Sequence, residues 1–274
     1  TVVNAFHIEA LRQMAQMAKA IGKNHEAEAF ESRAELAKSA FQEKLFDESA
    51  GIYRDGIETN HSSVHANFFP LAFGLVPADK RKGVLSWLKQ REMQCSVYAA
   101  QYFMDALFAG GADQKALDLI LADGDRSWKH MASSGTTISW EAWDTKYKPN
   151  QDWNHAWGAA PANLLPRYVL GAQPRSAGWT TATIRPCPGD LKFARGKVPT
   201  SRGPIQIDWT NDGSFDLSLS LPQGMSAVVE LPAPKGSTGV FADGKPIPAK
   251  RSGDRWMVVD EVSGSVRFVV KSRD

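Results

Sequence analysis

The chain reads Gly135-Thr-Thr-Ile-Ser-Trp-Glu-Ala-Trp-Asp144 and shortly afterwards Asn150-Gln-Asp-Trp-Asn-His-Ala-Trp157, and these two stretches hold four of its nine tryptophans. Buried helices and strands fill with aliphatic side chains, whereas these stretches mix indole rings with carboxylates, amides and one imidazole. A pyranose ring has apolar C–H faces that pack on indoles, and hydroxyl groups that need hydrogen-bond donors and acceptors. The two stretches therefore predict a sugar-binding site.

Glu141 lies between Trp140 and Trp143 and is the candidate catalytic group. A carboxyl group in a partly desolvated loop can act as an acid or a base near neutral pH. A purely structural interpretation stays open: the tryptophans would pack under a long loop, Glu141 would cap a helix, and Asp152 would be the N-cap of a helix that begins near Trp153.

Composition excludes several classes of protein. Of the 274 residues, 43% are apolar and 23% charged, which is typical of a globular protein and not of a disordered one. The net charge of +2 is too small to indicate nucleic-acid binding, and no apolar run is long enough to span a membrane. The two cysteines, Cys95 and Cys187, are far apart, so neither a disulfide framework nor a cysteine-based metal site is predicted. We expect a neutral small molecule or polymer as the partner.

The first part of the chain predicts helices. Apolar residues recur at spacings of three and four in Phe6–Ile21, and Gly22 ends that segment. A second helix follows it directly, which predicts a helical hairpin. Further helices, ending with one from Asn154 to Leu170, bring the expected number to about eight; those between are at Ser62–Leu75, Ala78–Glu92, Val97–Ala109, Asp113–Leu121 and Ser127–Ser133.

The period changes after Gly171. Ile205, Ile207 and Trp209 alternate with polar residues, and a second alternating run follows the Asp212-Gly213 turn. These patterns predict strands packed as a small antiparallel β-sandwich; further strands are expected at Ala227–Leu231, Gly239–Ala242, Trp256–Val259 and Val266–Val270.

Five features follow one another along the chain: helical hairpins, the Gly135–Asp144 motif, the Asn-His-Ala-Trp-Gly motif at Asn154–Gly158, the Leu-Gly-Ala-Gln-Pro motif ending at Pro174, and a β-rich tail. This combination resembles the bacterial α-L-rhamnosidases of the six-hairpin glycosidase group, glycoside hydrolase family 78. The resemblance covers nearly the whole chain.

The resemblance implies a fold and a division into domains. We expect residues 1–173 to be the later helices of an (α/α)6 six-hairpin barrel that carries the tryptophan-rich loop, and residues 174–274 to be the C-terminal β-sandwich. Because the chain begins at Thr1 without an initiator methionine or signal peptide and has fewer helices than the barrel, we expect a part of a longer enzyme. Its partner would then be the missing N-terminal part of the same enzyme or a second copy of the chain.

The resemblance also implies a reaction. Family members remove terminal α-L-rhamnose from glycosides or polysaccharides by inversion, and Glu141 matches the position of the general base. Inversion needs two carboxyl groups roughly 6.5–9.5 Å apart. The stretch that carries the general acid in the family has no match here, so we expect the acid on the missing N-terminal part. No metal or other cofactor is expected; His61 and His65 lie one helical turn apart but lack a third ligand.

Other site residues are implied less strongly. His155 would hydrogen-bond a sugar hydroxyl, unless it is tied to a backbone carbonyl. Asp55 lies beside Gly56 and could equally form a turn. The complete set of predicted substrate-binding residues is Trp140, Trp143, His155, Trp157, Tyr53, Asp55 and His65.

Two other functions stay open. A fragment of this kind could bind carbohydrate without catalysis. An α-solenoid interaction protein is a weaker alternative, because the helical segment from Met17 to Phe30 resembles one tetratricopeptide unit that is not repeated. For a polysaccharide-degrading enzyme we favour a periplasmic or extracellular location over the cytoplasm.

Overall fold

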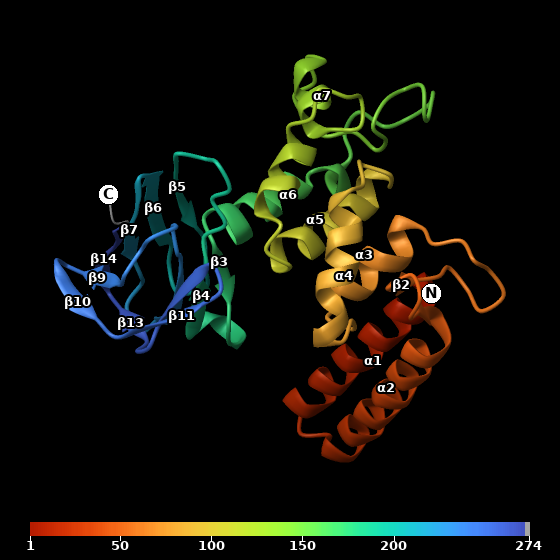
Figure 1. The fold of residues 1–274 in the computed structure, drawn as a ribbon, viewed down its shortest axis with the longest axis horizontal. Helices are drawn as coiled ribbons and strands as arrows, with labels where there is room; N and C mark the ends of the chain where they lie inside the picture. The colour runs from red at the N-terminus through yellow and green to blue at the C-terminus, as the bar shows by residue number, and fades with distance from the viewer. Residues whose placement is uncertain (272–274) are drawn as a thin grey trace. The chain divides into compact units, whose positions relative to one another are not determined.

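The structure is a computed structural model that describes residues 1–271. Its internal contacts divide the chain into two units, Thr1–Gly158 and Ala159–Asp274. The first unit is mainly helical and the second consists mainly of strands (Figure 1). Helices followed by predominantly antiparallel sheets agree with the predicted fold class.

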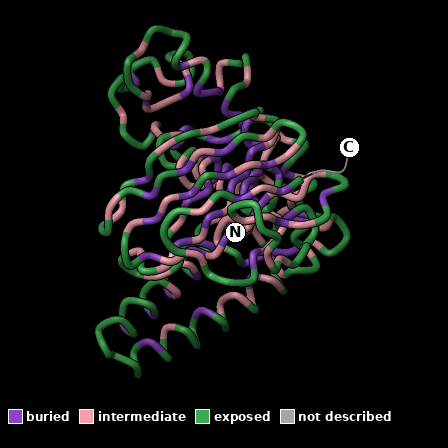
Figure 2. Tube along the Cα trace, turned by 90° about the vertical axis from the view of Figure 1, so that its left-hand side faces the viewer, coloured by how far each residue is buried: buried purple, intermediate pink, exposed green. Residues whose placement is uncertain are grey.

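The first unit begins with a helical hairpin. Helices α1 (Val2–Ala20) and α2 (Asn24–Leu45) lie side by side and bury mostly small residues, which lets the two helices pack closely (Figure 1). Buried positions recur along these helices with exposed positions between them (Figure 2). The unit continues with β1 (Phe46–Asp47), β2 (Ile52–Tyr53), α3 (Val64–Ala72), α4 (Ala78–Lys89), α5 (Val97–Ala109), α6 (Asp113–Ile120), α7 (Trp128–Ser133) and the 3₁₀ turn η1 (Ala156–Gly158).

Aromatic side chains form the core between α1, α3 and α5. Phe6 of α1 packs against Phe69 of α3 with ring centroids 4.8 Å apart, and against Tyr102 of α5 at 5.8 Å. Phe68 stacks on Phe103 at 5.4 Å, and both rings are fully buried. These contacts join three helices that are far apart in sequence, so they provide the rigid support for the loops that follow α5.

The second unit is built from two sheets. Its elements are α8 (Ala160–Leu164), the π-helical turn η2 (Leu165–Val169), β3 (Ala172–Pro174), η3 (Ala177–Trp179), β4 (Thr181–Ile184), β5 (Phe193–Val198), β6 (Ile205–Asp212), β7 (Ser214–Ser220), β8 (Ser226–Pro232), β9 (Val240–Ala242), β10 (Lys245–Ile247), β11 (Ala249–Ser252), β12 (Arg255–Val258), β13 (Val262–Ser263) and β14 (Ser265–Val270). The strand orders are β10-β9-β14-β7-β6-β5 and β11-β12-β8-β4-β3, with β13 paired to β8. Among the described residues, β4 with β8 is the one parallel pair, and the other strand pairs are antiparallel.

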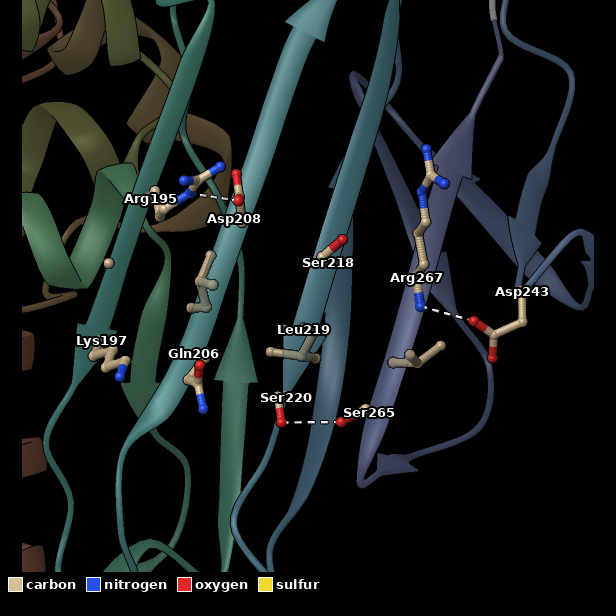
Figure 3. A pocket seen from close by; sticks show the side chains of 13 residues that line it. Arg195, Lys197, Gln206, Asp208, Ser218, Leu219, Ser220, Asp243, Ser265 and Arg267 are labelled. Carbon is tan, nitrogen blue, oxygen red and sulfur yellow. Dashed lines mark hydrogen bonds and ion pairs between the residues drawn. The ribbon is translucent and has the colours of Figure 1, made fainter.

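Alternation along β6 and β7 sets the two faces of the first sheet. Ile207, Trp209 and Leu217 point inward and are buried, whereas the polar residues between them face outward. The outward face carries a groove of about 530 Å³ across β5, β6, β7 and β14, lined by both polar and apolar residues (Figure 3). The hairpin predicted at Asp212-Gly213 is confirmed, with Asp212 opposite Ser214.

One predicted helix is wrong. The segment from Asn154 to Leu170 is not continuous: it is divided into η1, α8 and η2. Pro161 and Pro166 lack the amide hydrogens that an uninterrupted helix would use, which explains the division. The turns α8 and η2 group with the strands by contact, so the units divide at Gly158, whereas the domain boundary predicted from the sequence lies at residues 173 and 174.

None of the helices in residues 1–271 combines the length and the apolar character needed to cross a bilayer.

We predict that Trp209→Ala destabilises the second unit strongly. Trp209 is fully buried, and its indole N–H donates to the carbonyl oxygen of Val169 at 2.9 Å. Removing a buried aromatic side chain costs about 3–5 kcal/mol of the free energy of unfolding. Chemical denaturation of the full chain measures this loss, and Thr210→Ala, on the exposed face of the same strand, is the control. Similar unfolding midpoints for the two variants would contradict the assigned core.

Candidate active site

The predicted site loop follows α7 and runs from Ser134 to His155 without helix or strand. Helix α7 begins at a cap in which the Ser127 hydroxyl accepts the amide hydrogen of His130 at 3.0 Å. With no regular secondary structure of its own, the loop depends on specific hydrogen bonds and on packing for its shape.

Backbone hydrogen bonds hold the two halves of the loop side by side. The Glu141 amide donates to the Asp152 carbonyl at 3.0 Å, and the His155 amide donates to the Ser139 carbonyl at 2.9 Å. The Ser139 hydroxyl returns a bond to the His155 carbonyl at 2.7 Å. These bonds place Glu141, Asp152 and His155 next to one another.

Gly158 is required where η1 meets this loop. A Cβ atom at position 158 would lie 2.3 Å from the carbonyl oxygen of Trp140. Any other residue at position 158 would therefore displace the backbone next to Glu141.

Two of the predicted sugar-contacting tryptophans are buried beneath the loop. Trp140 and Trp143 are each only 3% exposed. The Trp143 indole donates to the Cys95 carbonyl at 2.7 Å and packs edge-on against Trp128 at 5.0 Å. Trp128 in turn donates to the Gly158 carbonyl at 2.6 Å. Trp143 thus anchors the loop to the helical core, which is the packing role that the alternative interpretation gave to the tryptophans.

The other aromatic side chains remain exposed beside Glu141. Trp153 is 51% exposed and packs on Trp140 at 4.9 Å. Trp157 is 48% exposed and lies between His155, at 4.2 Å, and Tyr98 of α5, at 5.1 Å. These exposed rings offer apolar faces at the same surface as the polar groups.

The carboxylate of Glu141 is held at both oxygens. Oε1 pairs with the ammonium group of Lys148, and Oε2 accepts the amide hydrogen of Asp152 at 3.1 Å. The Lys148 hydrogen bond, and after it the Asp152 amide, lower the pKa of Glu141 below its ordinary value, against a smaller opposing effect of desolvation. From the sequence, either an acid or a base was conceivable; an ionised carboxylate is suited to accept a proton.

His155 and Asp152 complete the polar part of the site. The Nδ1 atom of His155 lies 3.4 Å from Oδ2 of Asp152. Three potential metal-ligand atoms, one each from Glu141, Asp152 and His155, lie within 4.8 Å of one another. Such a grouping could hold a metal ion. The Lys148 ammonium already binds Glu141 there, and its positive charge disfavours a divalent cation at the same oxygen.

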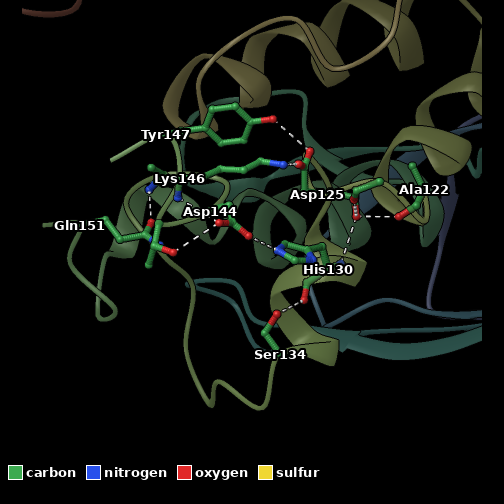
Figure 4. Close-up of polar contacts among 12 residues, drawn as sticks. Ala122, Asp125, His130, Ser134, Asp144, Lys146, Tyr147 and Gln151 are labelled. Atoms are coloured by element: carbon green, nitrogen blue, oxygen red, sulfur yellow. Dashed lines mark hydrogen bonds and ion pairs between the residues drawn. The ribbon is translucent and has the colours of Figure 1, made fainter. Parts of the chain in front are cut away.

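A second polar cluster ties the loop to α7 (Figure 4). Nε2 of His130 lies 2.7 Å from Oδ2 of Asp144. The backbone amide of Lys146 and the His130 ring lower the pKa of Asp144. The Lys146 ammonium pairs with Asp125, which also accepts the Tyr147 hydroxyl at 3.1 Å. Asp144 is therefore committed to holding the turn that follows Trp143.

The remaining predicted residues form a separate group around β2 and α3. Tyr53 is completely buried and donates its hydroxyl to Gln42 at 2.6 Å. The Asp55 carboxylate accepts the hydroxyl and amide of Ser63, at 2.6 and 3.0 Å, and pairs with His61. These contacts tie the Asp55 carboxylate to Ser63, the N-cap residue of α3.

His65 is half-buried against the ring of Phe68 at 5.2 Å, and burial lowers its pKa. These contacts of Tyr53, Asp55 and His65 are with residues of α2, of α3 and of the segment between β2 and α3. Their proposed contact with sugar stays a prediction.

The predicted set of site residues lacks Tyr98 and Lys148, and it also lacks Trp153, although Trp153 lies within the second motif. Tyr98 lies in a largely apolar helix, and its 50% exposure depends on the packing of α5 beside Trp157. Lys148 follows Glu141 by seven residues in an irregular loop, so no periodicity predicts that the two side chains meet. The only sequence signal for Lys148 was its position between the two motifs.

Paired helices that support a loop with an ionised carboxylate, a histidine and exposed indoles define a helical-hairpin protein with an aromatic, acidic site. A family model described as the bacterial alpha-L-rhamnosidase 6 hairpin glycosidase domain matches residues 1–169, and the corresponding C-terminal domain model matches residues 171–244. The chain belongs to the bacterial α-L-rhamnosidase six-hairpin glycosidase family. This assignment leaves no support for the α-solenoid alternative.

Individual relatives agree with the family. An alpha-L-rhamnosidase of Alteromonas sp. (strain LOR) is 26% identical over 250 residues, which cover 85% of this chain and 26% of the relative. The alpha-L-rhamnosidase structure from Dictyoglumus thermophilum matches with a TM-score of 0.85 and 25% identity over 98% of this chain and 31% of that one. The Streptomyces avermitilis alpha-L-rhamnosidase complexed with L-rhamnose has the same fold, with a TM-score of 0.81, 22% identity and coverage of 98% and 26%. The chain thus spans about a quarter to a third of these relatives.

We predict that Trp143→Phe loosens the site loop. The substitution removes the donor to the buried Cys95 carbonyl, and an unsatisfied buried acceptor costs about 1–3 kcal/mol of the free energy of unfolding. Denaturant unfolding measures the loss. Trp153→Phe, at an exposed position of the same loop, should change stability by less than about 0.5 kcal/mol. Equal unfolding midpoints for both variants would show that Trp143 does not anchor the loop.

Proposed function

We propose that the protein carrying this chain is an α-L-rhamnosidase that removes terminal α-L-rhamnose from glycosides or polysaccharides by inversion, with Glu141 as general base. One observation carries the proposal: the Glu141 carboxylate is hydrogen-bonded at both oxygens and lies beside His155 and two exposed indoles. Family membership and the relatives named as α-L-rhamnosidases support the sugar class.

In this mechanism Glu141 acts on a water molecule. The carboxylate takes a proton from the water while the oxygen of that water bonds to the anomeric carbon, on the face opposite the leaving group. The bond between the anomeric carbon and the glycosidic oxygen breaks at the same time, and a general acid protonates that oxygen. The lowered pKa of Glu141 supports the first role because it keeps the carboxylate ionised in weakly acidic solution.

The general acid is proposed to come from the earlier part of the family's six-hairpin domain, outside these residues. Asp152 is unsuited because its carboxylate lies within 4.8 Å of Glu141, whereas inversion needs a separation of roughly 6.5–9.5 Å to admit water. Asp144 is unsuited because it is bound to His130 and to the Lys146 amide.

Sugar recognition is assigned to the exposed side of the loop. Trp153, Trp157 and Tyr98 would pack on the C–H faces of rhamnose or of the group attached to it, and His155 would hydrogen-bond a hydroxyl. Trp140 and Trp143 would act from beneath, by holding the loop. The substrate partner is therefore a rhamnose-containing glycoside or polysaccharide.

We predict that Glu141→Gln, made in the polypeptide that carries these residues, lowers kcat on an aryl α-L-rhamnoside at least about a hundredfold, because the amide cannot accept the proton. The release of the aryl alcohol measures turnover. Glu35→Gln is the matched control, since Glu35 is also paired with a lysine but lies exposed on α2.

A Glu141→Gln variant that keeps more than half of the turnover would remove Glu141 from the reaction. A wild-type protein that binds rhamnose but never hydrolyses the rhamnoside would instead favour the binding-only alternative.

A further inference from the structure

Lys148 contacts the candidate base directly and lies in the segment that connects the two paired halves of the loop. Its ammonium pairs with Oε1 of Glu141, while Oε2 receives the Asp152 amide. The Glu141 side chain is 17% exposed and the Lys148 side chain 41%. The carboxylate is thus the more enclosed partner, and the lysine covers one of its oxygens.

The backbone around Lys148 directs its side chain towards Glu141. The amide of Tyr147 donates to the Asp144 carbonyl at 3.0 Å, and the Gln151 amide donates to the Lys148 carbonyl at 3.0 Å. The first turn ends just before Lys148 and the second begins at Lys148, and Pro149 restricts the backbone inside the second turn. Because Asp144 is itself held by His130, the position of Lys148 is tied to α7.

From these contacts we infer that Lys148 is a positioning residue for the proposed reaction: it holds one oxygen of the Glu141 carboxylate, so that the other oxygen stays aligned. The inference rests on the proposed function. Lys148 takes and gives no proton in this role, and it need not touch the sugar.

Three groups face the Glu141 carboxylate, and Lys148 dominates among them. Its hydrogen bond is the largest cause of the lowered pKa of Glu141, followed by the Asp152 amide; the charges of Lys148 and of His155 act in the same direction more weakly. The Asp152 carboxylate is 70% exposed and turns to His155. Loss of Lys148 should therefore raise the pKa of Glu141 even though the other neighbours remain.

The sign of the effect on activity follows from the role of Glu141 as base. The base works only when ionised, so activity falls as the pH drops through the pKa of Glu141. A higher pKa moves this acid limb of the pH profile to higher pH. A merely structural lysine would lower activity without moving the limb.

The test uses three variants in the polypeptide that carries these residues, assayed with an aryl α-L-rhamnoside. Lys148→Met should move the acid limb upward and lower kcat about tenfold, with KM changed less than about twofold, because alignment of the base is lost while sugar contacts remain. Lys148→Arg keeps the charge and should restore the wild-type limb. Lys146→Met is the matched control: Lys146 lies two residues away and pairs with Asp125.

A second measurement is independent of turnover. Carbon-13 NMR of protein labelled in both glutamate and lysine, with the Glu141 and Lys148 signals assigned through Glu141→Gln and Lys148→Arg, follows the titration of that carboxyl group and the response of the lysine beside it. In the wild type the Glu141 carboxyl should titrate below the ordinary glutamate range, and the side-chain signals of Lys148 should shift at the same pH. If Lys148→Met does not fold, this wild-type titration decides the question.

The inference would be overturned if the acid limb and the pKa of Glu141 stay unchanged in Lys148→Met. It would also be overturned if the Lys148 signals of the wild type do not shift while Glu141 titrates. Failure of the proposed function is a different result, namely retained turnover in Glu141→Gln. The two failures are therefore distinguishable.

Discussion

The site depends on the hydrogen-bonded pairing of Glu141 with Asp152. The Glu141 amide donates to the Asp152 carbonyl, and the Asp152 amide returns a bond to the Glu141 carboxylate. This reciprocal pair joins two halves of a loop that has no helix or strand, and it places His155 and the exposed indoles beside the carboxylate. Trp143 then fixes the paired loop to the helical unit through its hydrogen bond to the Cys95 carbonyl. Gly158 contributes because, lacking a Cβ atom, it lets the Trp140 backbone approach closely.

Much of the fold could be predicted from the sequence because the apolar residues recur at regular spacings over long segments. Helix α5 has the predicted bounds, and the β6–β7 hairpin follows from strict alternation around Asp212-Gly213. The segment from Asn154 to Leu170 was mispredicted because its apolar spacing is helical, whereas Pro161 and Pro166 remove the hydrogen bonds that a single helix needs. Short strands such as β10 and β11 were missed, since three or four residues show too little alternation.

The site was predictable in its composition but not in its detailed geometry. Tryptophans next to carboxylates indicated a sugar site, yet the same residue type serves two purposes: Trp143 is buried as an anchor, and Trp157 is exposed. The sequence cannot distinguish these, because exposure depends on which helix lies opposite. Tyr98 and Lys148 were not predicted for the same reason. Tyr98 contacts Trp157 and Lys148 contacts Glu141 only in the folded chain.

The central claim is that the loop around Glu141 holds the sugar, and a crystal structure of the protein with L-rhamnose bound tests it most directly. The account predicts the sugar beside Glu141, packed on Trp157 and hydrogen-bonded to His155, with the anomeric carbon facing the carboxylate. The groove of the second unit, across β5, β6, β7 and β14, is the alternative binding site against which this prediction is compared. Rhamnose bound in that groove, with the loop around Glu141 empty, would contradict the account.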